Sequence, residues 1–190
     1  MVSRESPLDE IKNFIRICLN ELYSKDAPLF QRNRQKGVYK GVCERCLVFR
    51  FAHYMQNRIQ DYHVDCDFNS SFGEYHDSKG NSIRKEQSGK PIENENGTKT
   101  GRFIDIIVHK RDSNPQNNFI CFEIKKWNNY NKKQIEKDKN NLRRLTSSRG
   151  YLFGFYLSLH RNKEKTKWTI YCNGAPIIEE TFVFQNENSN

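Results

Sequence analysis

The most constraining feature of the sequence is a helical stretch between two apolar strands. Asn118–Lys126 (NFICFEIKK) favours a strand, and Gly150–Leu159 (GYLFGFYLSL) is a nearly unbroken apolar run, typical of a strand buried on both faces. Between them, the polar segment Asn129–Thr146 carries a thin apolar stripe at helical spacing. Strand, helix and strand in this order predict a right-handed parallel crossover, and therefore a sheet with helices packed on it.

The remaining segments extend this architecture. Apolar residues at 3–4 residue spacing predict helices over Pro7–Tyr23 and within Gly37–Asp61. Period-two or Ile/Val-rich patterns predict strands at Tyr62–Phe68 and Arg102–His109. Asn173-Gly174 predicts a type I′ turn that joins two C-terminal strands, Lys167–Cys172 and Ala175–Phe184.

The expected order is therefore α, α, β, β, β, α, β, β, β, in an α/β fold with a mixed central sheet and an additional C-terminal β-hairpin. A length of 190 residues favours one domain, residues 1–190. Residues 77–100 are expected to form a variable surface loop or hairpin extension, and residues 185–190 a polar, frayed tail.

Composition excludes several classes of protein. Aromatic residues make up 13% of the chain, which argues against disorder although only 35% of the residues are hydrophobic. No apolar run approaches the ~18–20 residues of a membrane span, and the N-terminus lacks the apolar core of a signal peptide. We therefore expect a soluble, cytoplasmic protein with no membrane partner.

Six cysteines lie in apolar-patterned segments, and without an export signal we expect buried free thiols rather than disulfides. Cys43 and Cys46 form a single CxxC pair. We find no second ligand pair at a suitable spacing for a structural zinc site, so we interpret these cysteines as two small residues on one helix.

Positive charge is concentrated in one part of the chain. The net charge is +9, but residues 125–167 alone contain thirteen Lys or Arg against three acidic residues, a local excess of +10. Such a block indicates a partner rich in phosphates, that is, a nucleic acid. The alternative is a solvated face that reflects a genome bias toward Lys and Asn codons, although that bias explains the arginines of this segment less well.

Two neighbouring strands carry the residues that suggest chemistry. Glu123 and Lys125 lie two residues apart, so on a strand their side chains point to the same face, with Cα atoms about 7 Å apart. Asp105 interrupts an Ile/Val-rich strand, where an unpaired carboxylate is costly. If the strands are neighbours, Asp105 and Glu123 converge, and two carboxylates with waters suit Mg²⁺. Lys125 would then orient or deprotonate an attacking water and stabilise phosphate charge. The alternative is a cross-strand salt bridge of either acid with Lys125.

Two acidic residues on predicted helices are further candidates. Glu44 lies in line with the apolar stripe of its helix, so its carboxylate either points at the sheet or is a first-turn Glu favoured by the helix dipole. Asp138 lies on the stripe of Ile135, Leu142 and Leu145, so it either contacts the site or a phosphate-binding Lys, or it is a solvated helix acid, which is the interpretation we favour.

These residues resemble the PD-(D/E)XK (restriction endonuclease-like) nuclease superfamily, and in particular its small uncharacterised bacterial members. Asp105, Glu123-Ile124-Lys125 and the upstream Glu44 match the motif, and Ile104 stands where the family usually has proline. The likeness spans roughly Gly41–Leu157 and includes the helix Glu44–Tyr54, the strand Val64–Asn69 and the segment Asp105–His109.

The resemblance implies an αβββαβ core and Mg²⁺-dependent hydrolysis of phosphodiester bonds, with Mn²⁺ as a substitute. It implies that Asp105, Glu123, the Ile124 carbonyl and Glu44 serve the metal, and that Lys125 positions the water. The residues that we expect to contact phosphates are basic: Arg45, Arg102, Lys126, Lys132 and Lys133.

The expected function is thus a metal-dependent deoxyribonuclease, with an endonuclease favoured and a role in defence against foreign DNA as one setting. The alternatives are a non-catalytic nucleic-acid-binding module that kept the fold, and an assembly module whose charge serves solubility. A homodimer and a partner protein encoded in the same operon both stay open.

Overall fold

The fold was analysed in a computed structural model, which describes residues 2–31, 34–35, 38–39, 43–68, 74–76, 82–84, 92–93, 99–100, 104–112, 114–127 and 131–181. Three α-helices lie in this part of the chain: α1 (Leu8–Lys25), α2 (Glu44–Gln56) and α3 (Lys132–Ser148). Three short 3₁₀ segments also occur: η1 (Ala27–Phe30), η2 (Pro115–Asn117) and η3 (Lys163–Lys165). None of the described helices has the length and apolar character that crossing a lipid bilayer requires.

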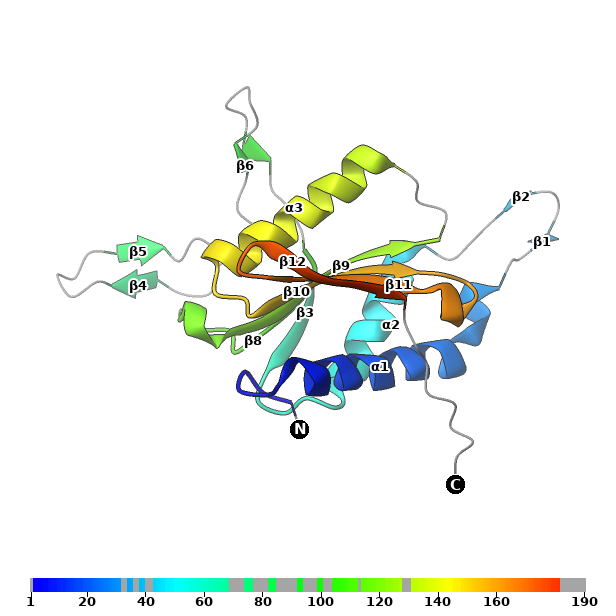
Figure 1. The fold of residues 1–190 in the computed structure, drawn as a ribbon, viewed down its shortest axis with the longest axis horizontal. Coiled ribbons are helices and arrows are strands. Elements are labelled where there is room, and N and C mark those ends of the chain that lie inside the picture. The colour runs from blue at the N-terminus through cyan, green and yellow to red at the C-terminus, as the bar shows by residue number, and fades with distance from the viewer. Residues whose placement is uncertain are drawn as a thin grey trace.

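A six-stranded mixed sheet forms the centre of the molecule, in the order β12-β11-β10-β9-β8-β3 (Figure 1). Its strands are β3 (His63–Phe68), β8 (Ile104–His109), β9 (Asn118–Lys126), β10 (Phe153–Leu159), β11 (Lys167–Cys172) and β12 (Ala175–Thr181). Shorter strands pair outside this sheet: β1 (Arg34–Gln35) with β2 (Val38–Tyr39), β4 (Glu74–His76) with β5 (Ser82–Arg84), and β6 (Ile92–Glu93) with β7 (Lys99–Thr100).

The strand–helix–strand prediction is confirmed, since β9 and β10 are parallel and α3 connects them. The C-terminal hairpin is also confirmed. Asn173 and Gly174 have φ values of 49° and 79°, as the predicted type I′ turn requires, and they join antiparallel β11 and β12. Of the predicted surface loop 77–100, only β5, β6 and β7 lie within the described residues, and the tail 185–190 lies outside them.

The two faces of the sheet are covered by different helices, so the molecule has three layers (Figure 1). On one face, α1 and α2 pack against Ile120, Phe122 and Ile124 of β9, and the Phe51 ring meets that of Phe122 edge-on at 5.6 Å. On the other face, Leu142 and Leu145 of α3 pack against apolar residues of the sheet. Successive residues of β9 therefore alternate between two cores, which directs Glu123 and Lys125 toward α3.

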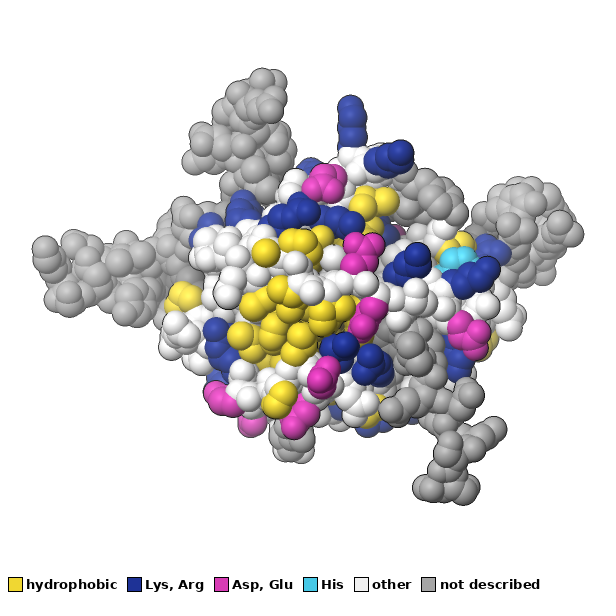
Figure 2. Space-filling model, viewed as in Figure 1, with side chains coloured by type: hydrophobic (Ala, Val, Ile, Leu, Met, Phe, Trp, Pro, Cys, Tyr) yellow, Lys and Arg dark blue, Asp and Glu magenta, His cyan; other side chains and the backbone are white. Residues whose placement is uncertain are grey.

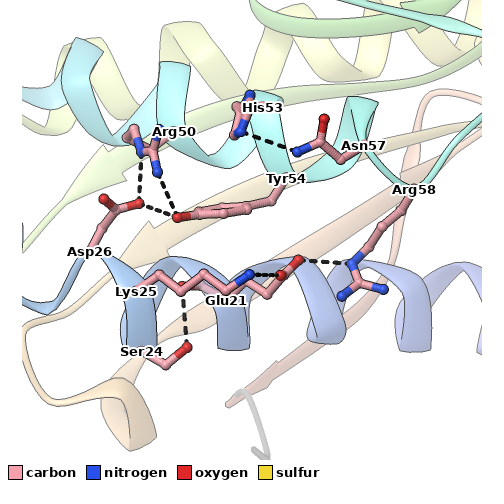
Figure 3. A network of polar contacts seen from close by, with 9 residues as sticks. All are labelled: Glu21, Ser24, Lys25, Asp26, Arg50, His53, Tyr54, Asn57 and Arg58. Carbon is pink, nitrogen blue, oxygen red and sulfur yellow. Dashed lines mark hydrogen bonds and ion pairs between the residues drawn. The ribbon is translucent and has the colours of Figure 1, made fainter.

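A polar network joins α1 to α2 and fixes the helix that carries Glu44 (Figure 3). Asp26, at the C-terminal end of α1, accepts hydrogen bonds from Arg50 Nε at 2.8 Å and from the Tyr54 hydroxyl at 2.7 Å. Glu21 of α1 pairs with Arg58 just after α2, at 2.8 Å. These contacts hold α2 against α1.

The outer surface is uneven in character. Figure 2 shows Lys and Arg side chains gathered over α3, which contains six of them. A hydrophobic patch lies below them beside β12, the sheet edge, where Ala175, Pro176 and Ile177 are exposed.

The prediction of buried cysteines is wrong for the CxxC pair. Cys18 and Cys121 are buried and Cys66 and Cys172 are half-buried, but Cys43 and Cys46 are exposed. The reason is their position at the start of α2, where Cys43 is the N-cap and Cys46 lies in the first turn. All six are free thiols, as expected.

Candidate active site

The candidate site begins where the ladder between β8 and β9 ends. Paired residues run along the two antiparallel strands as far as Ile106 and Phe122. One step further in the same register sets Asp105 opposite Glu123. At this point a side chain takes the place of a backbone carbonyl as hydrogen-bond acceptor. Asp105 Oδ2 accepts a hydrogen bond from the Ile124 backbone N–H at 2.7 Å. The two strands are thus neighbours, and they bring the two acids of the motif to the same place.

Glu123 is enclosed between the sheet and α3, with 3% of its surface exposed. Its Oε1 accepts a hydrogen bond from Asn141 Nδ2 of α3 at 2.7 Å. The sequence analysis did not identify Asn141, although it lies next to Leu142 and one turn from Asp138 on the buried side of α3. Tyr156 of β10, the parallel partner of Glu123, is buried beside it and was also missed.

Lys125 is held by two carboxylates from opposite layers of the molecule. Its Nζ lies 3.2 Å from Glu44 Oε1 of α2 and 3.1 Å from Asp138 Oδ2 of α3, and it donates to the Ile124 carbonyl at 3.2 Å. Among the described residues, these are its ion pairs, in place of the cross-strand salt bridge with Asp105 or Glu123 that was the alternative. Lys125 as a residue is 7% exposed, and these contacts fix the position of its ammonium group.

Glu44 points at the sheet, as one of its two interpretations predicted. Its second oxygen, Oε2, accepts a hydrogen bond from the Lys126 backbone N–H at 3.0 Å. One carboxylate thus binds both the side chain of Lys125 and the backbone that follows it. The first turn of α2 is thereby tied to the end of β9.

Asp138 contacts the site, so the favoured interpretation of it as a solvated helix acid is wrong and the alternative is the one that the structure supports. Asp138 is 3% exposed, its Oδ2 faces Lys125, and its Oδ1 accepts a hydrogen bond from Gln134 Nε2 at 2.7 Å. The signal was its position on the apolar stripe of α3, which is the side that packs on the sheet.

Burial and mutual repulsion perturb the carboxyl groups. Burial, then the charges of Asp105 and Asp138, raise the pKa of Glu123 well above its usual range. Burial also raises the pKa of Asp105 to about 6, against the opposing effect of Lys125. Burial opposes the charge on Lys125, but Asp105, Asp138 and Glu44 outweigh it and raise its pKa. Lys125 is therefore a cation at neutral pH, surrounded by more negative charge than it can neutralise.

The donor set fits a small hard cation. Among the described residues, no group of three or more His, Cys, Asp and Glu side chains is arranged to hold a metal ion. Mg²⁺ needs fewer protein ligands, because it keeps several waters and is commonly bound through one or two carboxylates. The hydrogen bonds of Asp105 and Glu123 engage one oxygen of each. Within the described part of the chain, this leaves Oδ1 of Asp105 and Oε2 of Glu123 for such an ion, and the carbonyl of Ile124, the residue after Glu123, is a further oxygen donor.

The four described residues that were expected to contact phosphates lie on three elements, α2, β9 and α3. Lys132 and Lys133 are exposed in the first turn of α3, where no acidic residue accompanies them. Arg45 is exposed and lies 3.5 Å from Asp67, and the Lys126 ammonium lies 6.0 Å from the centre of the Trp127 ring. Arg102 lies outside the described residues.

Comparison of the chain with protein-family models, with curated proteins and with solved structures finds no match in any of the three. The functional conclusion therefore depends on the site itself.

Proposed function

We propose that this protein is a Mg²⁺-dependent nuclease of the PD-(D/E)XK type that hydrolyses phosphodiester bonds in DNA. The observation that carries the proposal is the convergence of Asp105 and Glu123 at the end of the β8–β9 ladder, next to a buried Lys125. The order α2, β3, β8, β9, α3, β10 supports it, since αβββαβ is the core that the family resemblance implies.

In this proposal Asp105, Glu123 and the Ile124 carbonyl hold the metal ion, which supplies charge stabilisation for the scissile phosphate. Glu44 contacts Lys125 and the Lys126 N–H, so it acts as a positioning residue or contributes to the metal shell. Asp138 and Asn141 fix Lys125 and Glu123 from the α3 side.

Lys125 has the role of orienting the attacking water and stabilising negative charge that develops on the phosphate. Its raised pKa favours this role over that of a general base, because a base must be neutral to accept a proton. The substrate class is supported by α3, which contains six Lys and Arg residues and also contacts Glu123 and Lys125 through Asn141 and Asp138.

The second candidate is a nucleic-acid-binding module without catalysis, which the basic surface of α3 also favours. It predicts DNA binding that weakens with salt, with a linear log–log dependence, and no metal-dependent cleavage. Retention of both carboxylates and of the lysine supports the enzyme over this candidate.

The test is cleavage of plasmid and oligonucleotide DNA with Mg²⁺ or Mn²⁺, compared with chelated controls. We expect Glu123→Ala and Lys125→Ala each to lower the cleavage rate by about 100-fold or more. Glu179→Ala is the control for Glu123→Ala, because Glu179 is exposed on β12, three strands from β9 in the sheet order. Lys25→Ala is the control for Lys125→Ala, because Lys25 is exposed at the end of α1 and outside the basic segment 125–167. Cleavage that persists unchanged in both site variants would remove these residues from the mechanism.

A further inference from the structure

The two exposed cysteines of the chain meet at the start of α2. Cys43 Sγ and Cys46 Sγ lie 3.0 Å apart, whereas the other described cysteines are buried or half-buried. We propose that Cys43 and Cys46 are a reversible disulfide site that staples the first turn of α2, the turn that carries Glu44. The consequence for catalysis depends on the proposed function, but the thiol chemistry does not.

The helix geometry suits this bond. Cys43 is the N-cap residue, with an extended backbone (φ −67°, ψ 151°), and Cys46 is the third residue of the helix. Side chains at these two positions face each other across the first turn, as they do in a capping box. Residues three apart on a helix also have Cα atoms within the roughly 4.4–6.8 Å that disulfides span. The bond therefore forms without breaking the Cys46 N–H to Cys43 carbonyl hydrogen bond of 3.1 Å.

The turn between the thiols is the one that reaches the candidate active site. Glu44 follows Cys43 directly, and its carboxylate binds the Lys125 ammonium and the Lys126 N–H. The first turn of a helix lacks intrahelical partners for its N–H groups and is prone to fray. A disulfide across this turn would hold Glu44 over β9, and its reduction would release that restraint.

The chemistry balances with a small disulfide as oxidant. The thiolate of one cysteine attacks oxidised glutathione, which forms a mixed disulfide and releases one glutathione thiolate. The second cysteine then displaces the other glutathione and closes the protein disulfide. Two electrons pass from the two cysteines to glutathione, and a dithiol reductant reverses the reaction.

The test is titration of the full chain with oxidised and reduced glutathione, followed by alkylation and peptide mass spectrometry. We expect Cys43 and Cys46 to lose reactivity together as one intramolecular disulfide, before Cys66 or Cys172 reacts. Cys172→Ser is the control that should keep this behaviour, and Cys43→Ser should lose it.

Thermal unfolding gives a second readout. Closing so short a loop without strain should raise Tm by about 4–8 °C in the oxidised protein, and not in Cys43→Ser. Oxidation first at Cys66 or Cys172, a disulfide only between two chains, or a fall in Tm on oxidation would overturn the proposal. Because neither readout uses DNA, failure here and failure of the proposed function are distinguishable.

Discussion

Replacing Asp105 with Asn is expected to stabilise the metal-free protein although it removes a residue of the proposed site. Burial, reinforced by the charges of Glu44 and Asp138, raises the pKa of Asp105 to about 6. The ordinary value is about 3.9, and each unit of difference corresponds to about 1.36 kcal/mol. Keeping Asp105 ionised in the fold therefore costs about 3 kcal/mol at pH 7.

The pH dependence gives the sign of the effect. Because the folded protein binds the Asp105 proton more tightly than the unfolded chain does, its free energy of unfolding falls between about pH 4 and pH 6 and stays lower above that. Asn carries no charge but keeps an oxygen that can accept the Ile124 N–H. Asp105→Asn should thus match the wild type near pH 4 and exceed it at pH 7.

The assay is urea unfolding in the presence of a chelator, followed by the fluorescence of the buried Trp168. With an m-value of about 2–3 kcal/mol/M, the midpoint of Asp105→Asn at pH 7 should be higher by about 1–1.5 M. Asp61→Asn, which removes an exposed charge, is the control and should change little at either pH. An Asp105→Asn protein that is less stable than the wild type at pH 7, or equally stabilised at pH 4, would refute the reasoning.

Adding Mg²⁺ should then remove most of the stability difference between the two proteins. An ion that binds only the folded state stabilises it by about 2.7 kcal/mol at one hundred times its Kd. The wild type should show this gain and Asp105→Asn should lose most of it. An equal gain in both would mean that the ion does not contact Asp105.

Two further predictions concern the fold. Burial alone would raise the pKa of Asp26, but hydrogen bonds from Arg50 and Tyr54 outweigh it and hold that pKa below the usual ~3.9. The carboxylate therefore stabilises the fold above that pH, so Asp26→Asn should lower Tm at pH 7, and the difference should vanish as the pH falls through the folded pKa. Gly154→Val should lower the free energy of unfolding, measured in urea, by about 1–3 kcal/mol, because a Cβ at Gly154 would lie 3.1 Å from the Cβ of Leu142. An unchanged free energy of unfolding would show that α3 moves away from β10 without cost.

The strands of the sheet were predictable where the local sequence has a clear hydrophobic pattern. The bounds of β9 were predicted to the residue, because a run of alternating and apolar residues ends in two lysines and is preceded by a turn. The parallel pairing with β10 followed from the intervening helix. The position of β3 at the sheet edge, next to β8, could not be predicted, since it depends on contacts between distant segments rather than on local pattern.

The site was predictable in its strand residues and less so in its helical ones. Asp105 was identifiable because a carboxylate inside an apolar strand must have a partner, and the Ile124 N–H is that partner. Asp138 and Asn141 were misjudged or missed, because a polar residue on a thin apolar stripe is ambiguous until the opposite surface is known. Their partners, Lys125 and Glu123, are the polar residues of β9 on the face that α3 covers.

The error for Cys43 and Cys46 is the opposite one, because they were expected to be buried and are exposed. Cys46 lies on the same side of α2 as Phe49 and His53, all of them exposed. The buried stripe of this helix begins one residue later, at Leu47. Helical phase, read from that stripe, would have placed Cys46 outside the core; the apolar character of cysteine favoured the wrong interpretation.

The distribution of charge connects the site to its proposed substrate. At formal charge Glu44, Asp105, Glu123, Asp138 and Lys125 together carry −3, so the rest of the chain carries +9 − (−3) = +12. The raised pKa values of Asp105 and Glu123 make the site less negative than this when no cation is bound. A phosphodiester would be attracted to the rest of the chain over about a Debye length of 8 Å, but repelled more strongly by the site at close range, where the dielectric constant is lower. A divalent cation between Asp105 and Glu123 removes most of that repulsion and the cost of burying both carboxylates. The same charges that destabilise the metal-free fold therefore favour a metal-dependent site over a metal-independent binding module, for which they would be only a liability.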